Sequence, residues 1–574
     1  MQVDYVRGAQ AWSLLAEPSF NDAWDRVADR CPWATIFQRR PFLSIWYDCY
    51  RERFDPLMVI GRGEDSQIEA LWFLAVDRSS DELVGAGTHH SEYHGWAATP
   101  DQSAEFVRAA FETIAAANLS KRLTLVFLAP GIPLEWVGAG KGYRAFARPH
   151  RRGLMVLGDA SPTEKSLRKK SNKSRLSRLR RVGDVDLTRA ASRAELEPWI
   201  DEIAQFCDLR QGAINGATPF LSDPLKRELH LRLADEPDLL HSVLLRVGDQ
   251  IGAVHIGGID RGSVLLGLIS HSPFLAKHSP GKLILLLLGR MLAEQGYERF
   301  DMTPGGDYKD RFATEWDEVV ALDVFFDRRL QLAYSAKRSV RTLVKPLLAG
   351  IPATPKKRAG EVAERARTLL KRGILRSGRN ALKVLASRTW SDDEYRFYRL
   401  EPEEIPAREE FPEGCRVDSI EDLLAFNESA MDGVGYETFL RQSIDRLEAG
   451  GRVTTFRVDG ELAHYSWLTG AASSVGSEFG HQLELDEPGV VLWDDYTAPK
   501  FRGRGLHGAS LRARLELARR SGMTAYIGVA ARNGPSRHNI EKAGFKLCRR
   551  GFVKRRLGRT RLWLDEAGES TPRL

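Results

Sequence analysis

The chain has 574 residues, of which 43% are hydrophobic and 28% are charged, and it carries a formal net charge of +7. This composition is typical of a globular protein with several hydrophobic cores and excludes a largely disordered chain. The N-terminus lacks a basic start followed by a long apolar run, and the longest apolar run, residues 283–288, is far shorter than the roughly 20 residues that span a bilayer. We therefore expect a cytoplasmic protein of several domains.

The five cysteines show no metal-binding or disulfide pattern. They lie far apart, without a Cys-x-x-Cys pair or a histidine at the spacing of a zinc site: Cys31, Cys49, Cys207, Cys415 and Cys548. We expect no metal, no disulfide framework and an activity that survives EDTA.

Three stretches of the chain predict β-hairpins of similar design: residues 57–76, 241–259 and 453–468. Each consists of two apolar runs around a polar turn, and the last two turns contain Gly-Asp or Asp-Gly pairs, which favour tight turns. One such hairpin is common. Three of them at long intervals indicate repeated α/β modules.

Two basic segments separate the expected modules. Residues 165–181 have the pattern of an amphipathic helix, which we interpret as a bridge between two halves. In residues 337–388, Lys and Arg greatly outnumber the two acidic residues, and three prolines precede a helical stretch. This linker has three interpretations: a solvated connector, a contact with an anionic membrane surface, or a contact with RNA or another polyanion. Because only charge supports the last one, we do not expect a nucleic-acid partner.

Small-residue loops follow the second and third hairpins, at residues 278–282 and 502–508, and each opens a helical stretch. Glycines let a phosphate approach the backbone closely, and the helix N-terminus offers free N–H groups and the positive end of a dipole. Both loops therefore predict phosphate binding. An ordinary helix start is the competing interpretation.

Residues 490–545 carry a series of motifs in a fixed order. They contain an Arg-Gly-Arg-Gly loop before a helix, then a strand, then an Asn-x-x-Ser helix that ends in Gly-Phe. This order resembles the acetyl-CoA-binding core of the GNAT superfamily. His507 departs from the family pattern, because it stands where glycine or alanine is usual. The resemblance implies that acetyl-CoA or another acyl-CoA binds to Arg502, Gly503, Arg504, Gly505, Gly508, Asn533 and Ser536.

The GNAT resemblance also implies a mechanism. Backbone N–H groups polarise the acyl thioester, an acceptor amine or hydroxyl attacks it directly, and a carboxylate or an ordered water removes the proton. Asp494 and Asp495 precede the loop and are candidate catalytic bases, with ordinary strand-end carboxylates as the alternative. The tyrosine that many family members use as an acid would fall at Ile540. The proton for the leaving thiolate must then come from Tyr496 or water, or this module does not turn over.

Residues 1–335 resemble the CelD/BcsL-like (BioF2-like) acetyltransferase family. The resemblance rests on residues 33–38, the basic helix, the Ser-Pro-Gly-Lys loop and the stretch 300–309. That family is associated with bacterial polysaccharide synthesis and is similar to two GNAT-like halves in tandem, as in the FemABX aminoacyltransferases. It implies that Tyr308 and Lys309 lie in an active cleft and that Ser279, Gly281 and Lys282 contact a pyrophosphate.

These active-cleft residues have simpler interpretations as well. Tyr308 and Lys309 could only cap the end of a strand. His255 lies on an alternating strand and is the best candidate in this module for a catalytic proton acceptor at neutral pH. A structural histidine is the competing interpretation.

We therefore expect an α/β chain of tandem GNAT-like modules with mixed, largely antiparallel central sheets flanked by helices. The expected parts are a first half at 1–160, a second half at 161–335, the linker at 336–395 and a GNAT domain at 396–574. The expected function is an acyl-CoA-dependent N- or O-acyltransferase that modifies a sugar or sugar-linked intermediate of surface polysaccharide biosynthesis, at the inner membrane if the linker binds lipid. The alternatives are a FemABX-like aminoacyl-tRNA-dependent transferase and a non-catalytic CoA-binding or assembly protein.

Overall fold

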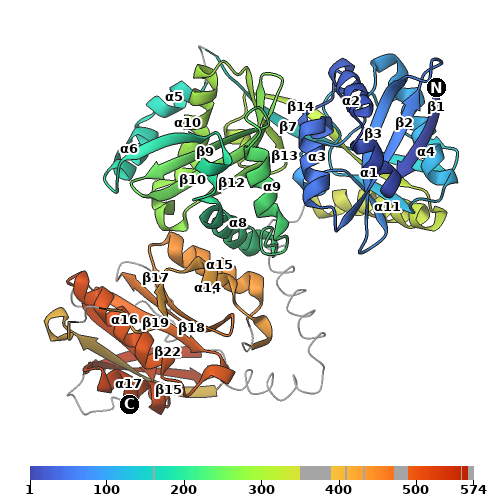
Figure 1. Cartoon of the computed structure of the whole chain (residues 1–574). Coiled ribbons are helices and arrows are strands. Elements are labelled where there is room, and N and C mark those ends of the chain that lie inside the picture. Colours follow the sequence, from blue (N-terminus) through green and yellow to red (C-terminus); the bar gives the residue numbers. More distant parts are fainter. Residues whose placement is uncertain are drawn as a thin grey trace. The chain divides into compact units, whose positions relative to one another are not determined.

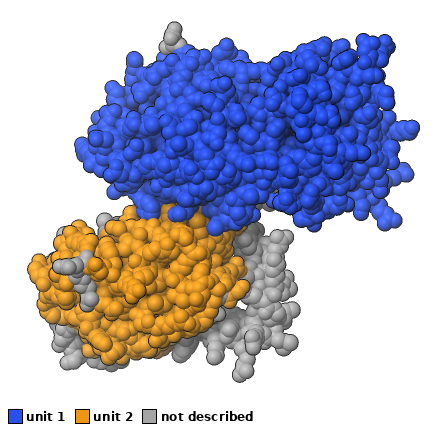
Figure 2. Space-filling view, viewed as in Figure 1, with its two compact units in different colours: residues 1–208, 218–344 blue, residues 209–217, 345–574 orange. Residues whose placement is uncertain are grey.

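The computed structural model describes residues 1–158, 162–349, 390–407, 410–430, 434–470, 489–556 and 559–566. The chain forms two compact units, which Figure 2 shows in different colours. Unit 1 comprises residues 1–208 and 218–344, and unit 2 comprises residues 209–217 and 345–574. Within the described residues, no helix is both long enough and apolar enough to cross a membrane.

Unit 1 begins with a four-stranded antiparallel sheet in the order β1-β2-β3-β4. Its elements are β1 (Gln2–Arg7), α1 (Ala9–Leu15), α2 (Pro18–Arg30), η1 (Ile36–Gln38), α3 (Arg40–Cys49), β2 (Phe54–Arg62), β3 (Ile68–Asp77), β4 (Glu82–Gly85), η2 (Thr88–His90) and α4 (Pro100–Ala116).

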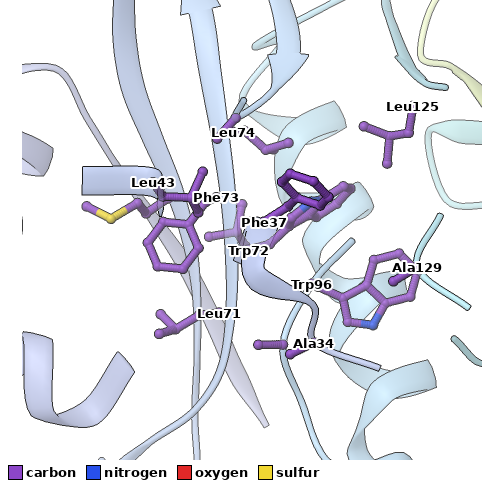
Figure 3. Close-up of a cluster of buried hydrophobic side chains, with 14 of the residues drawn as sticks. Ala34, Phe37, Leu43, Leu71, Trp72, Phe73, Leu74, Trp96, Leu125 and Ala129 are labelled. Carbon is purple, nitrogen blue, oxygen red and sulfur yellow. The ribbon is translucent and has the colours of Figure 1, made fainter. Parts of the chain in front are cut away.

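Strand β3 is buried on both faces, as its unbroken apolar sequence favours. Successive side chains point to opposite sides of a strand. Figure 3 shows Trp72 on one side with Trp96, and Phe73 on the other side with Leu43. Trp72 meets Trp96 at a ring-centroid distance of 5.6 Å, and Phe73 stacks on Trp24 at 4.0 Å. Packing of aromatic rings on both faces thus holds the helices to this sheet.

The rest of unit 1 is a ten-stranded sheet with helices around it (Figure 1). Its strands are β5 (Arg122–Leu125), β6 (Ala139–Gly140), β7 (Tyr143–Val156), β8 (Val185–Ala190), β9 (Leu240–Val247), β10 (Gln250–Asp260), β11 (Ser263–Leu265), β12 (Leu268–His271), β13 (Arg299–Pro304) and β14 (Glu315–Phe325). Its helices are α5 (Pro162–Arg168), α6 (Lys170–Arg180), α7 (Arg193–Leu196), α8 (Ile200–Asn215), α9 (Leu225–Ala234), η3 (Pro273–His278), α10 (Pro280–Glu294), η4 (Lys309–Arg311) and α11 (Arg328–Ala349).

The ten-stranded sheet extends across the predicted boundary at residue 160. Strand β14 pairs along its length with β7 and also pairs with β5, and both partners precede that boundary. The predicted helix at 165–181 is two helices, α5 and α6, because the backbone at Lys169 is extended. The predicted linker begins inside α11, and its helical stretch at 366–385 lies outside the described residues.

Unit 2 contains an eight-stranded sheet in the order β16-β17-β18-β19-β20-β15-β21-β22. Its strands are β15 (Trp390–Leu400), β16 (Cys415–Val417), β17 (Arg452–Val458), β18 (Glu461–Gly470), β19 (Gly489–Thr497), β20 (Thr524–Ala530), β21 (Lys546–Arg556) and β22 (Arg559–Glu566). Its helices are η5 (Pro402–Glu404), α14 (Ile420–Leu424), η6 (Glu428–Ala430), α15 (Tyr436–Glu448), η7 (Pro499–Phe501), α16 (Leu506–Arg520) and α17 (Gly534–Lys542).

The predicted fold class is confirmed. The three predicted hairpins are the antiparallel pairs β2–β3, β9–β10 and β17–β18. Between the named strands of the described residues, only β11–β13 and β19–β20 pair in parallel. In unit 2 the parallel pairing stops at Leu492 opposite Ile527, although β19 continues to Thr497. The two strands therefore separate beyond this point, next to the start of α16.

Candidate functional sites

The loop and helix starts of unit 2 surround a cavity of about 1040 Å³. The cavity is lined by the end of β19, the loop before α16 and the first turns of α16 and α17. Figure 1 labels these three elements in unit 2. Seven predicted cofactor-binding residues line it together: Arg502, Gly503, Arg504, Gly505, Gly508, Asn533 and Ser536. Small-molecule sites have volumes of about 300–1000 Å³, and this cavity lies at the upper end of that range.

Two glycines give the loop its open shape. Gly503 and Gly505 have φ angles of +79° and +77°, which side-chain-bearing residues rarely adopt, and no atom lies within 4 Å of where a Cβ would be. Gly505 is the N-cap of α16 and brings no capping side chain. The first N–H groups of a helix have no acceptor within the helix. They are therefore available to an anion in the cavity.

Asn533 and Ser536 have a local structural role at the same cavity. The Asn533 side-chain oxygen accepts a hydrogen bond from the Ser536 backbone N–H at 3.3 Å, which is an ordinary N-cap of α17. The motif thus shapes the second helix start that faces the cavity.

The two candidate carboxylates of unit 2 are both held by arginines. Arg514 is fully buried and donates to both carboxylate oxygens of Asp495. Asp494 pairs with Arg446 and, in contrast to Asp495, does not line the cavity. Both carboxylates are therefore engaged in ion pairs, and Asp495 is the one of the two that faces the cavity.

His507, which marks the departure from the GNAT pattern, lies in the cavity wall in the first turn of α16. The Asn539 side-chain amide donates to its Nδ1 at 3.0 Å, which leaves the proton of a neutral ring on Nε2. That nitrogen lies 3.6 Å from Asp495 Oδ1. Burial lowers the pKa of His507, and Asp495 opposes this effect. Ile540 is fully buried, whereas Tyr496 lines the cavity.

In unit 1, the predicted pyrophosphate residues form the start of α10. Ser279 is its N-cap with a φ of +58°. Gly281 packs closely, since a Cβ there would lie 2.7 Å from His271 Nδ1. The pKa of Lys282 is lowered by burial and by three other cations, Lys169, Arg175 and Arg311. Positive charges thus gather at this helix N-terminus.

The predicted active-cleft residues of unit 1 differ in exposure. Tyr308 is 41% exposed. Lys309 Nζ donates to the carbonyl and hydroxyl oxygens of Thr303 at 3.1 and 3.0 Å and to the Pro304 carbonyl at 3.3 Å. These bonds use all three ammonium donors, so Lys309 holds the end of β13 in place. His255 is fully buried, with Nε2 at 3.3 Å from the Leu265 carbonyl oxygen.

One group in the described part of the chain has the residue types of a metal site. The possible ligand atoms of His89, His90 and Asp223 lie within 4.8 Å of one another. The indole N–H of Trp46 can only donate, and it lies 3.3 Å from His90 Nδ1, so the proton of neutral His90 is on Nε2. That nitrogen faces Asp223 Oδ2 at 3.3 Å. The hydrogen bonds therefore fit a histidine–carboxylate pair rather than a ligand set.

Sequence reasoning missed Arg514 and Glu92. Arg514 lies in an amphipathic helix, where a charged residue is expected on the surface. Glu92 is half-buried, next to Tyr93, in a polar stretch that includes His89 and His90. That density of titratable residues was the only signal in the sequence.

The comparisons with known proteins find a family model and distant structures. Residues 166–312 match the model described as "Acetyltransferase (GNAT) domain". No curated protein matches the chain. Similar solved structures include FemX (11% identity, 54% of this chain and 98% of that chain, TM-score 0.38). L-PGS from Bacillus licheniformis is also similar, with 12% identity, a coverage of 58% of this chain and 97% of that chain, and a TM-score of 0.33. A tandem GNAT protein from the clavulanic acid biosynthesis pathway has 14% identity, a coverage of 68% of this chain and 100% of that chain, and a TM-score of 0.21.

At these identities and TM-scores, the solved structures carry no argument about activity. The family model supports an acyltransferase activity. The residues that match the GNAT acetyltransferase model, 166–312, lie in unit 1 except for residues 209–217. The finer resemblance to the CelD/BcsL-like family stays a prediction, as does the assignment of 396–574 as a further GNAT domain.

Proposed function

We propose that the chain transfers an acyl group from acyl-CoA, bound in the cavity of unit 2, to an amine or hydroxyl of an acceptor. The observation that carries this proposal is the cavity of about 1040 Å³, because two helix starts and an open glycine loop face it. Arg502, Arg504 and Lys542 add positive charge to the same walls. Phosphate groups would lie against the loop, and the thioester would reach the separated ends of β19 and β20.

In this proposal Asp495 is the carboxylate nearest to the reaction. Arg514 donates to both of its carboxylate oxygens, and His507 Nε2 lies 3.6 Å from its Oδ1. Asp495 would therefore orient the His507 ring, which brings a titratable group to the cavity wall. Asp494 would have a structural role with Arg446.

For the acceptor we retain a sugar or sugar-linked intermediate, which rests on the family association alone. A second candidate function is an aminoacyl-tRNA-dependent transferase. The observation that favours it is the gathering of Lys169, Arg175, Lys282 and Arg311 at the start of α10, since clustered cations bind nucleic-acid phosphates. Tight tRNA binding that weakens with salt, and an activity that ribonuclease abolishes, would support this candidate.

Calorimetry of acetyl-CoA binding to the full chain tests the main proposal, with Gly508→Asp compared with Gly508→Ala. A Cβ at Gly508 would make only an ordinary contact, 3.6 Å from Arg512 Nη1, so both variants should fold. The aspartate places a negative charge where phosphates would bind, and we expect it to weaken the unit 2 site by about tenfold or more. The alanine should leave it unchanged.

Absence of acetyl-CoA binding, or equal binding by both variants, contradicts the proposed donor site. Binding without any release of CoA in the presence of amine and sugar acceptors would favour a non-catalytic CoA-binding protein.

A further inference from the structure

Charged groups from distant parts of unit 1 meet around Glu92. Lys309, Asp301 and Lys226 all act on its carboxyl group, and they come from η4, β13 and α9. Glu92 itself follows η2 in the N-terminal part of unit 1 and is half-buried. A carboxylate between two lysines, partly open to solvent, is a group that proteins seldom place without a function.

One buried carboxylate fixes both sides of this cluster. Asp301 Oδ2 accepts a hydrogen bond from the hydroxyl of Tyr93, the neighbour of Glu92, at 2.8 Å. Asp301 Oδ1 accepts one from the backbone N–H of Thr303 at 2.8 Å, and Thr303 in turn accepts two bonds from Lys309. The segment that carries Glu92 and the segment that carries Lys309 are thus tied to the same side chain. This is the preorganisation that a reaction site needs.

The backbone is strained in both segments of this cluster, the one that carries Glu92 and the one that holds Lys309. Among the described residues, Thr88 and Thr303 are the only β-branched residues with a positive φ, at 45° and 52°. Such a conformation costs on the order of 1–3 kcal/mol and persists only where the surroundings impose it. Thr88 precedes Glu92 by one turn, and Thr303 holds Lys309. Strain of this kind gathers at functional sites.

The short helix η4 connects this cluster with the predicted pyrophosphate site of unit 1. Lys309 opens η4 and acts on Glu92, whereas Arg311 ends it and acts on Lys282 at the start of α10. An acyl donor held at α10 would therefore lie near the cluster.

We propose that Glu92 is the proton-accepting group of a second acyl-transfer site, located in unit 1. The acceptor nitrogen or oxygen forms a bond to the acyl carbon, and the bond from that carbon to sulfur breaks. Glu92 takes the proton of the attacking group and later releases it to solvent, while CoA leaves as a thiolate that is protonated by solvent. This inference rests on the proposed function, because it uses the same acyl donor.

The electrostatics support this role. Burial and, to a lesser extent, Asp301 raise the pKa of Glu92, while Lys309 and Lys226 lower it, and the result of these opposing effects is a pKa of about 7. A base is most effective when its pKa lies near the working pH. The other candidates in this unit are less suitable, because the three ammonium donors of Lys309 are used and His255 is sealed in the core.

The test measures acetyl transfer from acetyl-CoA to glucosamine by the full chain between pH 5.5 and 9. In the Gly508→Asp background, where unit 2 contributes least, Glu92→Gln should lower kcat by about 10²–10⁴-fold without changing KM for acetyl-CoA. It should also remove the fall in kcat/KM below about pH 7 that we expect while Glu92 is in place. Glu92→Asp should restore part of the activity. Glu82→Gln changes an exposed carboxylate on β4, in the same N-terminal part of unit 1, and is the matched control that should change nothing.

Gly508→Asp separates the two sites. If transfer survives Gly508→Asp and is lost when Glu92→Gln is added to that variant, the site in unit 1 is supported. Transfer that is lost with Gly508→Asp but unchanged in Glu92→Gln overturns this inference and leaves the proposed function intact. Absence of transfer by a chain that binds acetyl-CoA also overturns it. A chain that does not bind acetyl-CoA at all overturns the proposed function, and this inference with it.

Discussion

Burial decides the chemistry of His255. The ring is fully buried, meets Phe300 edge-on at a centroid distance of 5.3 Å and has one weak polar contact, with the Leu265 carbonyl oxygen. Burial lowers its pKa to about 3, because the charged ring would lose its hydration. Such a weak base, buried away from solvent, is poorly suited to remove a proton from a substrate. Its arrangement favours the structural interpretation.

The low pKa of His255 predicts a pH-dependent stability. As pH falls below 6.5, the unfolded chain binds a proton at this residue and the folded chain does not, so stability present above pH 6.5 is lost toward pH 3. The loss is about 1.4 kcal/mol per pH unit. We therefore expect the gap in unfolding free energy between the wild type and His255→Gln to narrow by about 2 kcal/mol from pH 7.5 to pH 5.

Urea unfolding at the two pH values checks this prediction. His538→Gln is the matched control, because His538 is exposed. A gap that stays constant for His255→Gln would show that this histidine binds a proton as readily in the folded protein as in the unfolded chain.

Helices α10 and α16 begin in a similar way, each with a glycine in the first turn, but the two glycines have different surroundings. A Cβ on Gly281 would lie 2.7 Å from His271 Nδ1, whereas a Cβ on Gly508 would lie 3.6 Å from the flexible end of Arg512. We expect Gly281→Ala to cost about 1–3 kcal/mol through overpacking. Gly508→Ala should raise the free energy of unfolding by about 0.5–1 kcal/mol, because alanine is the better helix former.

Thermal unfolding of the two alanine variants measures this difference. A lower melting temperature for Gly281→Ala and an equal or higher one for Gly508→Ala are the expected results. Equal effects would mean that the start of α10 has room for a side chain.

The sequence predicted those elements that depend on short-range chemistry. The hairpins followed from alternation and turn residues, and the open glycine loop followed from its motif. The pairing of β14 with β5 depends on segments almost 200 residues apart, and no local pattern indicates it. The same holds for the candidate sites. Arg514 meets Asp495, and Glu92 meets Lys309, only because the folded sheets bring them together.

At the scale of the whole molecule, one of the hydrophobic cores of unit 1 contains residues of both halves. The cluster that contains Trp72 and Trp96 also includes Leu229, Leu265 and Val319 from the second half. In unit 2, a separate core joins α16 and α17 to the central strands through Leu511 and Ile540, among others. Residues that share a core tend to unfold together. We therefore expect one unfolding transition for unit 1 and another for unit 2.

Acetyl-CoA should raise the temperature at which unit 2 unfolds, because a ligand at the start of α16 stabilises the core to which that helix belongs. A concentration one hundred times the Kd adds about 2.7 kcal/mol. Scanning calorimetry of the full chain measures the shift, and Gly281→Ala identifies the unit 1 transition by lowering it. Gly508→Asp should reduce the shift of unit 2 clearly and leave any shift of unit 1 in place. A shift of unit 2 that Gly508→Asp leaves unchanged would place its ligand outside the cavity at α16.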